Sequence, residues 1–253
     1  NGTTNDTVRA LVFAIVTRRY VTRRIESKLW HWLEMGIHAV RLLRLNDTTD
    51  VDLIDKEALM LNEMGLVKQK LAYLQDAIQL YEGSLSLYKL LQDIESQATT
   101  LNNIGMIYDA LGEKRKALDY FTQILSMLDS VENSPLHATV FNNIGLIYSI
   151  LGDLNTSLEY YEKAFQLYQT MNDKEGEGTV LNNIGLIYDE LGNQEIALSY
   201  YTQSLKMFQI VGDNAGEATA LNNIGAIYRY LGDIQQSKDY YNQALTLYRL
   251  VND

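Results

Sequence analysis

Cysteine is absent from this 253-residue chain, and histidine occurs only three times. Without cysteine there is no disulfide framework and no thiolate chemistry, which favours a reducing compartment. His31, His38 and His137 have no metal-ligand spacing, so zinc or triad chemistry lacks its parts. We therefore expect a non-catalytic, cytoplasmic protein with no metal site and no cofactor.

Long hydrophobic runs are also absent, and there is a single proline. The apolar run at residues 11–16 is too short to span a bilayer, which needs about 20 residues. Its basic pairs, Arg18-Arg19 and Arg23-Arg24, follow the run, whereas in a signal peptide the basic residues precede it. For this run we favour a helix packed on the first of the sequence repeats described below, over a membrane-surface helix or a short strand. We expect no membrane span.

Positive charge is scarce outside the N-terminal part. The first 50 residues carry eight Lys/Arg against five Asp/Glu, whereas the other 203 carry 13 against 27. Such an acidic surface repels phosphate backbones, so nucleic acid is not an expected partner. It would favour a basic partner, or it serves only to keep the protein soluble.

What the chain has in abundance is an internal repeat of 40 residues. The segment Leu-Asn-Asn-Ile-Gly, with a tyrosine three residues later, starts at Leu101, Leu181 and Leu221, and with Phe in first place at Phe141. A weaker copy starts at Leu61. A fixed period of 20 to 50 residues is typical of stacked-repeat proteins. The chain is therefore expected to be an all-α, right-handed solenoid of helix-turn-helix units.

The fourth repeat shows the predicted layout. A first helix over residues 177–191 is followed by Gly192, which tolerates positive φ where that helix ends. A second helix covers residues 194–211, with Asn193 as its N-cap, as Asp153 and Asp233 would be in other repeats. Its face repeats a small residue and, four positions later, an aromatic one, which are packing requirements. These positions are Ala77, Ala117, Ser157, Ala197 and Ser237, and then Tyr81, Phe121, Tyr161, Tyr201 and Tyr241.

Two regions follow from this pattern. Residues 1–56 form an N-terminal helical segment packing on the first repeat, and residues 57–253 form five repeats. A helix over residues 30–45 is expected to bury Trp32, Leu33, Ala39, Val40, Leu42 and Leu43. The predicted repeats are about 57–96, 97–136, 137–176, 177–216 and 217–253. Because no initiator Met is present and the last repeat runs to the final residue, we expect a piece of a longer protein.

The recurring positions resemble the tetratricopeptide repeat over residues 57–253. In the fourth repeat the matching residues are Leu181, Ile184-Gly185, Tyr188, Leu191-Gly192, Ala197, Tyr201 and Ser204. The period of 40 departs from the family's usual period of about 34, and the proline near the end of the unit is absent. The chain resembles the Pins/LGN type of adaptor array, kinesin light chain repeats, and the arrays of bacterial STAND-class signalling ATPases. The resemblance implies a protein-binding module.

A helical wheel of the first helix in the second repeat separates two sides. Leu101, Ile104, Gly105, Tyr108 and Leu111 form the core side, and the opposite side would line the concave wall. Constant Asn beside a variable, partly apolar strip suits a peptide groove, because amides can bond a ligand backbone of any sequence. The predicted groove residues are Asn102, Asn103, Met106, Asn142, Asn143, Leu146, Asn182, Asn183, Leu186, Asp189, Glu190, Asn222, Asn223, Arg229 and Tyr230.

Asparagine is a poor helix former, so its recurrence indicates a role. Either the Asn pairs hold the repeats in register, or at least the second Asn of each pair contacts the ligand. The groove offers few cations beyond Lys70 and Arg229, which argues against a carboxylate clamp of the co-chaperone type.

We predict a protein that binds a peptide or protein segment, basic or partly apolar, in the concave groove. As a scaffold or adaptor it would bridge partners. The alternative is a sensing or autoinhibitory arm of a larger signalling protein such as a STAND-type ATPase. Self-association through the end repeat is a third option, because Leu247, Tyr248 and Leu250 end the array without a polar capping helix.

Overall fold

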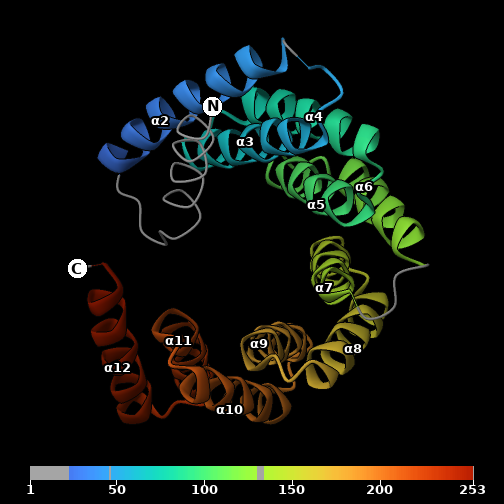
Figure 1. Ribbon diagram of the computed structural model, residues 1–253. Coiled ribbons are helices and arrows are strands. Elements are labelled where there is room, and N and C mark those ends of the chain that lie inside the picture. The colour runs from blue at the N-terminus through green and yellow to red at the C-terminus, as the bar shows by residue number, and fades with distance from the viewer. Residues whose placement is uncertain (1–22, 46, 130–133, 253) are drawn as a thin grey trace. The chain divides into compact units, whose positions relative to one another are not determined.

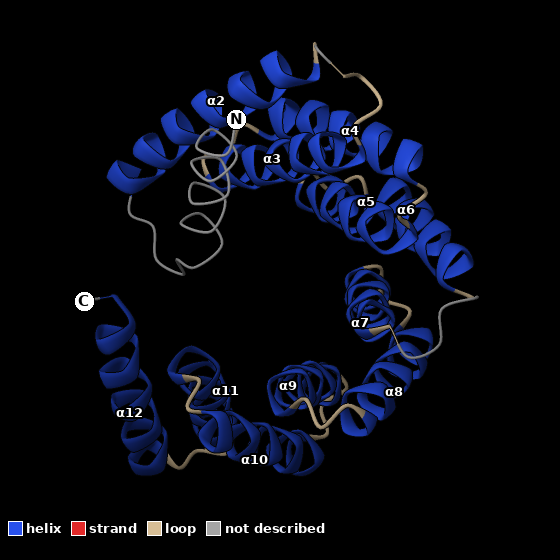
Figure 2. Cartoon of the chain, viewed as in Figure 1, coloured by secondary structure: helices blue, strands red, loops and turns tan. Residues whose placement is uncertain are grey.

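The computed structural model describes residues 23–45, 47–129 and 134–252, and these residues form helices joined by turns, with no strand among them (Figures 1 and 2). The chain divides into two compact units, Asn1–Ser130 and Val131–Asp253. The first unit contains α2 (Arg23–Arg44), α3 (Val51–Lys70), α4 (Leu74–Leu91), α5 (Ile94–Ala110) and α6 (Lys114–Leu128). The second contains α7 (Pro135–Ile150), α8 (Leu154–Thr170), α9 (Lys174–Glu190), α10 (Gln194–Val211), α11 (Asn214–Tyr230) and α12 (Ile234–Asn252).

Within each unit every helix packs on the next one in sequence. Helices α3, α5, α7, α9 and α11 are the first helices of their repeats, and α4, α6, α8, α10 and α12 are the second helices. The predicted fold class, an all-α solenoid of helix-turn-helix repeats, is confirmed.

The first helices of neighbouring repeats lie side by side in the second unit. Helix α9 contacts both α7 and α11, whereas among the described residues no second helix of this unit contacts another second helix. Figure 1 shows α7, α9 and α11 on one side of the unit, with α8 and α10 on the opposite side. Because only the first helices touch one another, they form the inner row of this unit.

Turns and caps follow the predicted chemistry with one exception. Gly192 has φ of 76°, and the carboxylates of Asp153 and Asp233 accept hydrogen bonds from the backbone N–H groups of Thr156 and Gln236. Asn193 occupies the N-cap position of α10 as predicted, but its side chain makes no capping hydrogen bond. Its backbone N–H instead donates to the carbonyl oxygen of Tyr188 at 2.8 Å, which ties the start of α10 to the end of α9.

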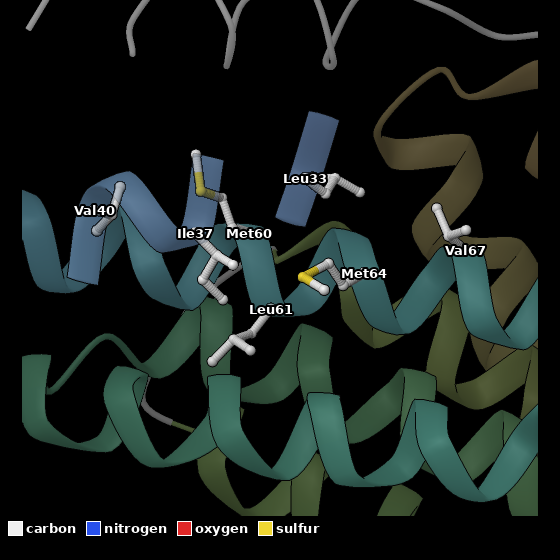
Figure 3. Packing of buried hydrophobic residues seen from close by; sticks show 7 residues of the cluster. All are labelled: Leu33, Ile37, Val40, Met60, Leu61, Met64 and Val67. Atoms are coloured by element: carbon white, nitrogen blue, oxygen red, sulfur yellow. The ribbon is translucent and has the colours of Figure 1, made fainter. Parts of the chain in front are cut away.

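Helix α2 packs on α3 through an apolar cluster (Figure 3). It contributes Leu33, Ile37 and Val40, which are spaced by four and three residues and so share one helix face. The predicted burial of Trp32 and Leu42 is wrong. Each is half-exposed, because the buried face is centred on Ile37.

An ion pair closes the end of this contact. The guanidinium groups of Arg41 and Arg44 both bind the carboxylate of Glu57, which is buried on α3. Helix α3 begins at Val51, so the predicted start of the first repeat at residue 57 falls inside it. The helix predicted for the apolar run at residues 11–16 lies outside the described residues.

Candidate functional site

All of the predicted groove residues lie on the first helices, and we consider each unit separately. Asn102, Asn103 and Met106 are on α5 of the first unit. The predicted residues of the second unit are distributed over α7, α9 and α11, the three helices of its inner row. Their environments differ, and they fall into three groups: the asparagines, an apolar strip, and polar residues near the helix ends.

The asparagines form a ladder between consecutive repeats. Asn183 Nδ2 donates to Asn142 Oδ1 at 3.0 Å, and Asn223 Nδ2 donates to Asn182 Oδ1 at 2.8 Å. In both rungs the second Asn of one repeat binds the first Asn of the preceding repeat. The rungs therefore fix the axial register of α7, α9 and α11.

The first unit contains one rung of the same kind. Asn103 Nδ2 donates to Asn62 Oδ1 at 3.3 Å, linking α5 to α3. Asn62 was not among the predicted site residues, although the weaker copy of the motif at Leu61 carries it. The sequence signal for it was therefore present.

The amides that donate in the ladder have further hydrogen-bonding capacity. A primary amide has two N–H donors and an oxygen with two lone pairs, and a rung uses one N–H of the donor residue. Asn183 and Asn223 are half-buried rather than enclosed. The hydrogen bonds between the Asn side chains support the register role, and each donor amide keeps groups that a ligand could bond.

An exposed apolar strip runs beside the ladder in the second unit. Leu146 on α7 and Leu186 on α9 occupy equivalent positions, and both side chains are exposed; the next position along, on α11, is Ala226. In the first unit the equivalent Met106 is also exposed, and its sulfur lies 3.6 Å from Asn102 Nδ2. These side chains leave apolar area available to a partner.

The polar residues near the ends of α9 and α11 divide between internal and outward contacts. Asp189 Oδ1 accepts a hydrogen bond from Gln194 Nε2 at 2.9 Å, so its carboxylate braces its own repeat. Glu190, Arg229 and Tyr230 are exposed. The side chains of these three residues are thus accessible to solvent, whereas Asp189 contributes to the packing of its own repeat.

Behind the ladder, glycines allow the two helices of each repeat to approach closely. A Cβ on Gly185 would lie 2.7 Å from Tyr201 Cε1, and one on Gly145 would lie 2.8 Å from Tyr161 Cδ1. Both tyrosines are fully buried. Burial, together with the carboxylates of Asp189 and Glu190, raises the pKa of Tyr201.

The predicted burial of the leucine at the end of each first helix is wrong. Leu111 and Leu191 were expected to be buried with Leu101 and Ile104, but both are half-exposed. Each is the C-cap residue of its helix, where the chain turns away from the helix axis. The same exposure recurs at Leu151 and Leu231.

A second tyrosine in four of the five repeats was missed. Tyr188 stacks on Tyr200 with ring centroids 5.4 Å apart and planes 5° from parallel. The equivalent stacked pairs are Tyr108–Tyr120, Tyr148–Tyr160 and Tyr228–Tyr240. The tyrosines at 120, 160, 200 and 240 recur with the 40-residue period, and that period was the signal for them.

Searches for other kinds of site gave negative results within the described residues. In residues 23–45, 47–129 and 134–252, no group of three or more His, Asp or Glu side chains could hold a metal ion. None of the helices in the part of the chain that the structure describes combines the length and the apolar composition needed to cross a bilayer.

Comparison with solved structures places the fold beside several repeat proteins. BtubC (BKLC) from P. vanneervenii matches with a TM-score of 0.75 and 20% identity, over 92% of this chain and 93% of that one. The apo form of RapI matches at 0.67 and 13%, over 85% of this chain and 59% of that one. A putative kinesin light chain with nearly identical TPR-like repeats, from Podospora anserina, matches at 0.58 and 14%, over 76% and 94%. No curated protein matches the sequence.

A family model describes the repeat directly. The tetratricopeptide repeat model matches residues 56–130, 136–210 and 197–249, which together cover most of the chain. The resemblance drawn from the Leu-Asn-Asn-Ile-Gly segments is confirmed by this match. The chain belongs to the tetratricopeptide repeat family, whose helical arrays are protein-interaction modules.

Proposed function

We propose that the inner row of the second unit binds a segment of a partner protein through the Asn ladder and the apolar strip beside it. The observation that carries this proposal is the ladder itself. It presents the amides of Asn183 and Asn223 in register on adjacent helices, next to exposed Leu186. Binding would proceed by contacts, with no covalent step.

The contacts suit a polypeptide ligand. Neighbouring packed helices lie about 8–10 Å apart, and an extended chain rises about 3.3 Å per residue. Leu146 and Leu186 therefore match ligand side chains about three residues apart. The amides of the ladder can bond a ligand backbone without regard to its sequence.

Charge restricts the partner further. The chain has a formal net charge of -11, and Glu190 is exposed at the end of α9. We infer a partner segment that carries Lys or Arg between its apolar residues. Electrostatic attraction of this kind raises association rates, and added salt weakens it.

The experiment is a selection from a displayed peptide library on the 253-residue chain, followed by titration of the selected peptide. Leu146→Glu combined with Leu186→Glu should weaken binding at least about tenfold, since buried apolar anchors dominate such interfaces. The matched control is Leu151→Glu combined with Leu191→Glu, two half-exposed leucines at the turns. An equal loss of peptide affinity in both double variants would contradict the proposal. Selected peptides that bind the Leu146/Leu186 variant with unchanged affinity would contradict it too.

A further inference from the structure

The stacked tyrosine pairs of two repeats hold lysines of the chain itself. In the first unit, Lys116 Nζ lies 5.0 Å from the ring centre of Tyr108. In the second unit, Lys163 Nζ lies 4.8 Å from the ring centre of Tyr160. An ammonium group is attracted to the negative face of an aromatic ring. Because the first ring comes from a first helix and the other from a second helix, either member of a stacked pair can bind a cation.

A carboxylate accompanies the lysine in the first unit. Burial raises the pKa of Tyr120, and the neighbouring phenol of Tyr108 and the carboxylate of Glu82 raise it further, whereas Lys116 lowers it. These effects require Glu82 on α4 and Lys116 on α6 to lie near the same ring. The first unit therefore combines a stacked pair, a carboxylate from the preceding repeat and a lysine.

The fourth repeat has the stacked pair and the carboxylate but has no lysine at the equivalent position. Tyr188 and Tyr200 stack with ring centroids 5.4 Å apart. Burial raises the pKa of Tyr200, and Tyr188 and the carboxylate of Glu162 on α8 raise it further. Glu162 is exposed and forms no ion pair with any other described residue. The position of Lys116 is taken by Ile196.

The ring of Tyr200 is not paired with a cation of its own chain within the described residues. No lysine or arginine among them lies over Tyr188 or Tyr200, although Lys163 lies over the equivalent ring one repeat earlier. Gln203 takes the position of Lys163, and its Nε2 donates to the carbonyl oxygen of Ser199 at 3.3 Å, along its own helix. Because Tyr200 is only partly buried, its ring can be reached from outside.

We propose that Tyr188, Tyr200 and Glu162, the aromatic cation site, bind a lysine side chain of a partner protein. The ammonium group lies over the ring of Tyr200 with Glu162 as its counter-ion. Its alkyl stem packs on Ile196, which is exposed and lies one helical turn before Tyr200. We assign lysine because both cations that the chain places over its own tyrosine pairs are lysines. Tyr200 lies on a second helix, so this site is separate from the inner row and its test does not depend on the proposal made there.

The fifth repeat provides an internal comparison. Tyr228 and Tyr240 stack with the same geometry, with centroids 5.4 Å apart and planes 5° from parallel. Thr202 takes the position of Glu162, so this pair has no equivalent carboxylate. A cation should therefore bind more weakly at Tyr240 than at Tyr200.

The probe is lysine with an acetylated α-amino group and an amidated carboxyl group. It is titrated against the full 253-residue chain carrying isotope-labelled tyrosine rings, and the rings are followed by NMR. Tyr200→Phe and Tyr240→Phe identify the two ring signals. The Tyr200 signal should shift saturably, and the Tyr240 signal should need a higher ligand concentration. Glu162→Gln should weaken binding at Tyr200 about two- to fivefold, as expected for an exposed ion pair.

Two matched variants distinguish this site from general attraction to an acidic surface. Gln203→Lys supplies a competing ammonium group at the position of Lys163, and it should weaken binding at Tyr200 at least about tenfold because that group is present at high effective concentration. Gln243→Lys changes the net charge equally one repeat later, and it should change affinity at Tyr200 less than about twofold.

The neutral control is the same compound with its side-chain amine acetylated, which should leave the Tyr200 signal unshifted. Absence of a saturable shift at Tyr200 with the charged compound would overturn the proposal. An equal loss of affinity in Gln203→Lys and Gln243→Lys would overturn it as well, and so would an equal shift caused by the neutral compound.

Discussion

The side-chain amide of Asn223 donates a hydrogen bond of 2.8 Å to the side-chain oxygen of Asn182, one repeat earlier. Asn182 is buried, so its oxygen has little access to water. A buried acceptor that loses its donor costs about 1–3 kcal/mol, whereas an exposed one is satisfied by solvent. The stability of the junction between α9 and α11 therefore depends on Asn223, the donor of this rung.

Asn223→Ala should lower the free energy of unfolding by about 1 kcal/mol, after the better helix propensity of alanine has offset part of the loss. Asn222→Ala is the control, because Asn222 is exposed and the propensity gain should make that change neutral or slightly stabilising. Urea unfolding followed by circular dichroism measures both. Equal effects of the two substitutions would mean that the rung contributes nothing.

Gly185→Ala should destabilise the fold by about 1–3 kcal/mol, because its Cβ would lie 2.7 Å from the buried ring of Tyr201. At Gly225 the nearest atoms belong to the ring of Tyr241, at 3.0 Å, and that ring is only half-buried. Gly225→Ala should therefore be much milder, since the ring can shift and alanine favours the helix by about 1 kcal/mol. Thermal melting of the two variants gives the comparison, and a larger loss at Gly225 would contradict it.

Tyr201→Phe should leave stability unchanged or raise it. Among the described residues, the buried hydroxyl of Tyr201 has no hydrogen-bond partner, and the second repeat already has Phe121 at this position. Tyr81 Oη instead donates to Gln69 Oε1 at 2.9 Å, so Tyr81→Phe should cost about 1 kcal/mol. Thermal melting of both variants checks the prediction. A loss of stability in Tyr201→Phe as large as that in Tyr81→Phe would contradict it.

Glu63→Gln should stabilise the protein at neutral pH. Burial raises the pKa of Glu63 above its ordinary value of 4.5, and Lys70 opposes this only in part. The folded state thus binds the proton more tightly than the unfolded chain does, and the carboxyl's contribution to stability falls as the pH rises through the raised pKa.

Unfolding curves recorded from pH 4 to pH 7 test this sign. The difference in unfolding free energy between Glu63→Gln and wild type should grow toward neutral pH. A difference that is independent of pH would show that the titration of Glu63 is not coupled to folding.

The repeat pattern predicted the helices well, because the spacing of Leu101, Ile104 and Tyr108 reports which face of a helix is apolar. It could not predict which neighbouring helix that face meets. The Asn pairs were placed on the correct helices, yet their bonds to each other depend on the axial offset between repeats. A helical wheel contains no information on that offset.

Errors were concentrated at helix ends and on the non-repeating helix. A wheel placed Leu191 with the core, but a C-cap residue lies where the helical path stops. Trp32 and Leu42 were expected to be buried because they are apolar. Helix α2 is not repeated in the sequence, so no second copy could indicate which of its faces is buried. Tyr200 was overlooked because its neighbour, Tyr201, already accounted for the aromatic signal.

The ladder has a consequence for how such an array changes during evolution. In the second unit the repeat that begins with α9 carries one donor and one acceptor of the ladder. Asn183 donates to the preceding repeat, and Asn182 accepts from the following one. Duplication or deletion of one whole 40-residue repeat would leave every remaining rung with a donor and an acceptor. Insertion of any other length inside a repeat would separate them, so the array can change its number of repeats more readily than the length of a repeat.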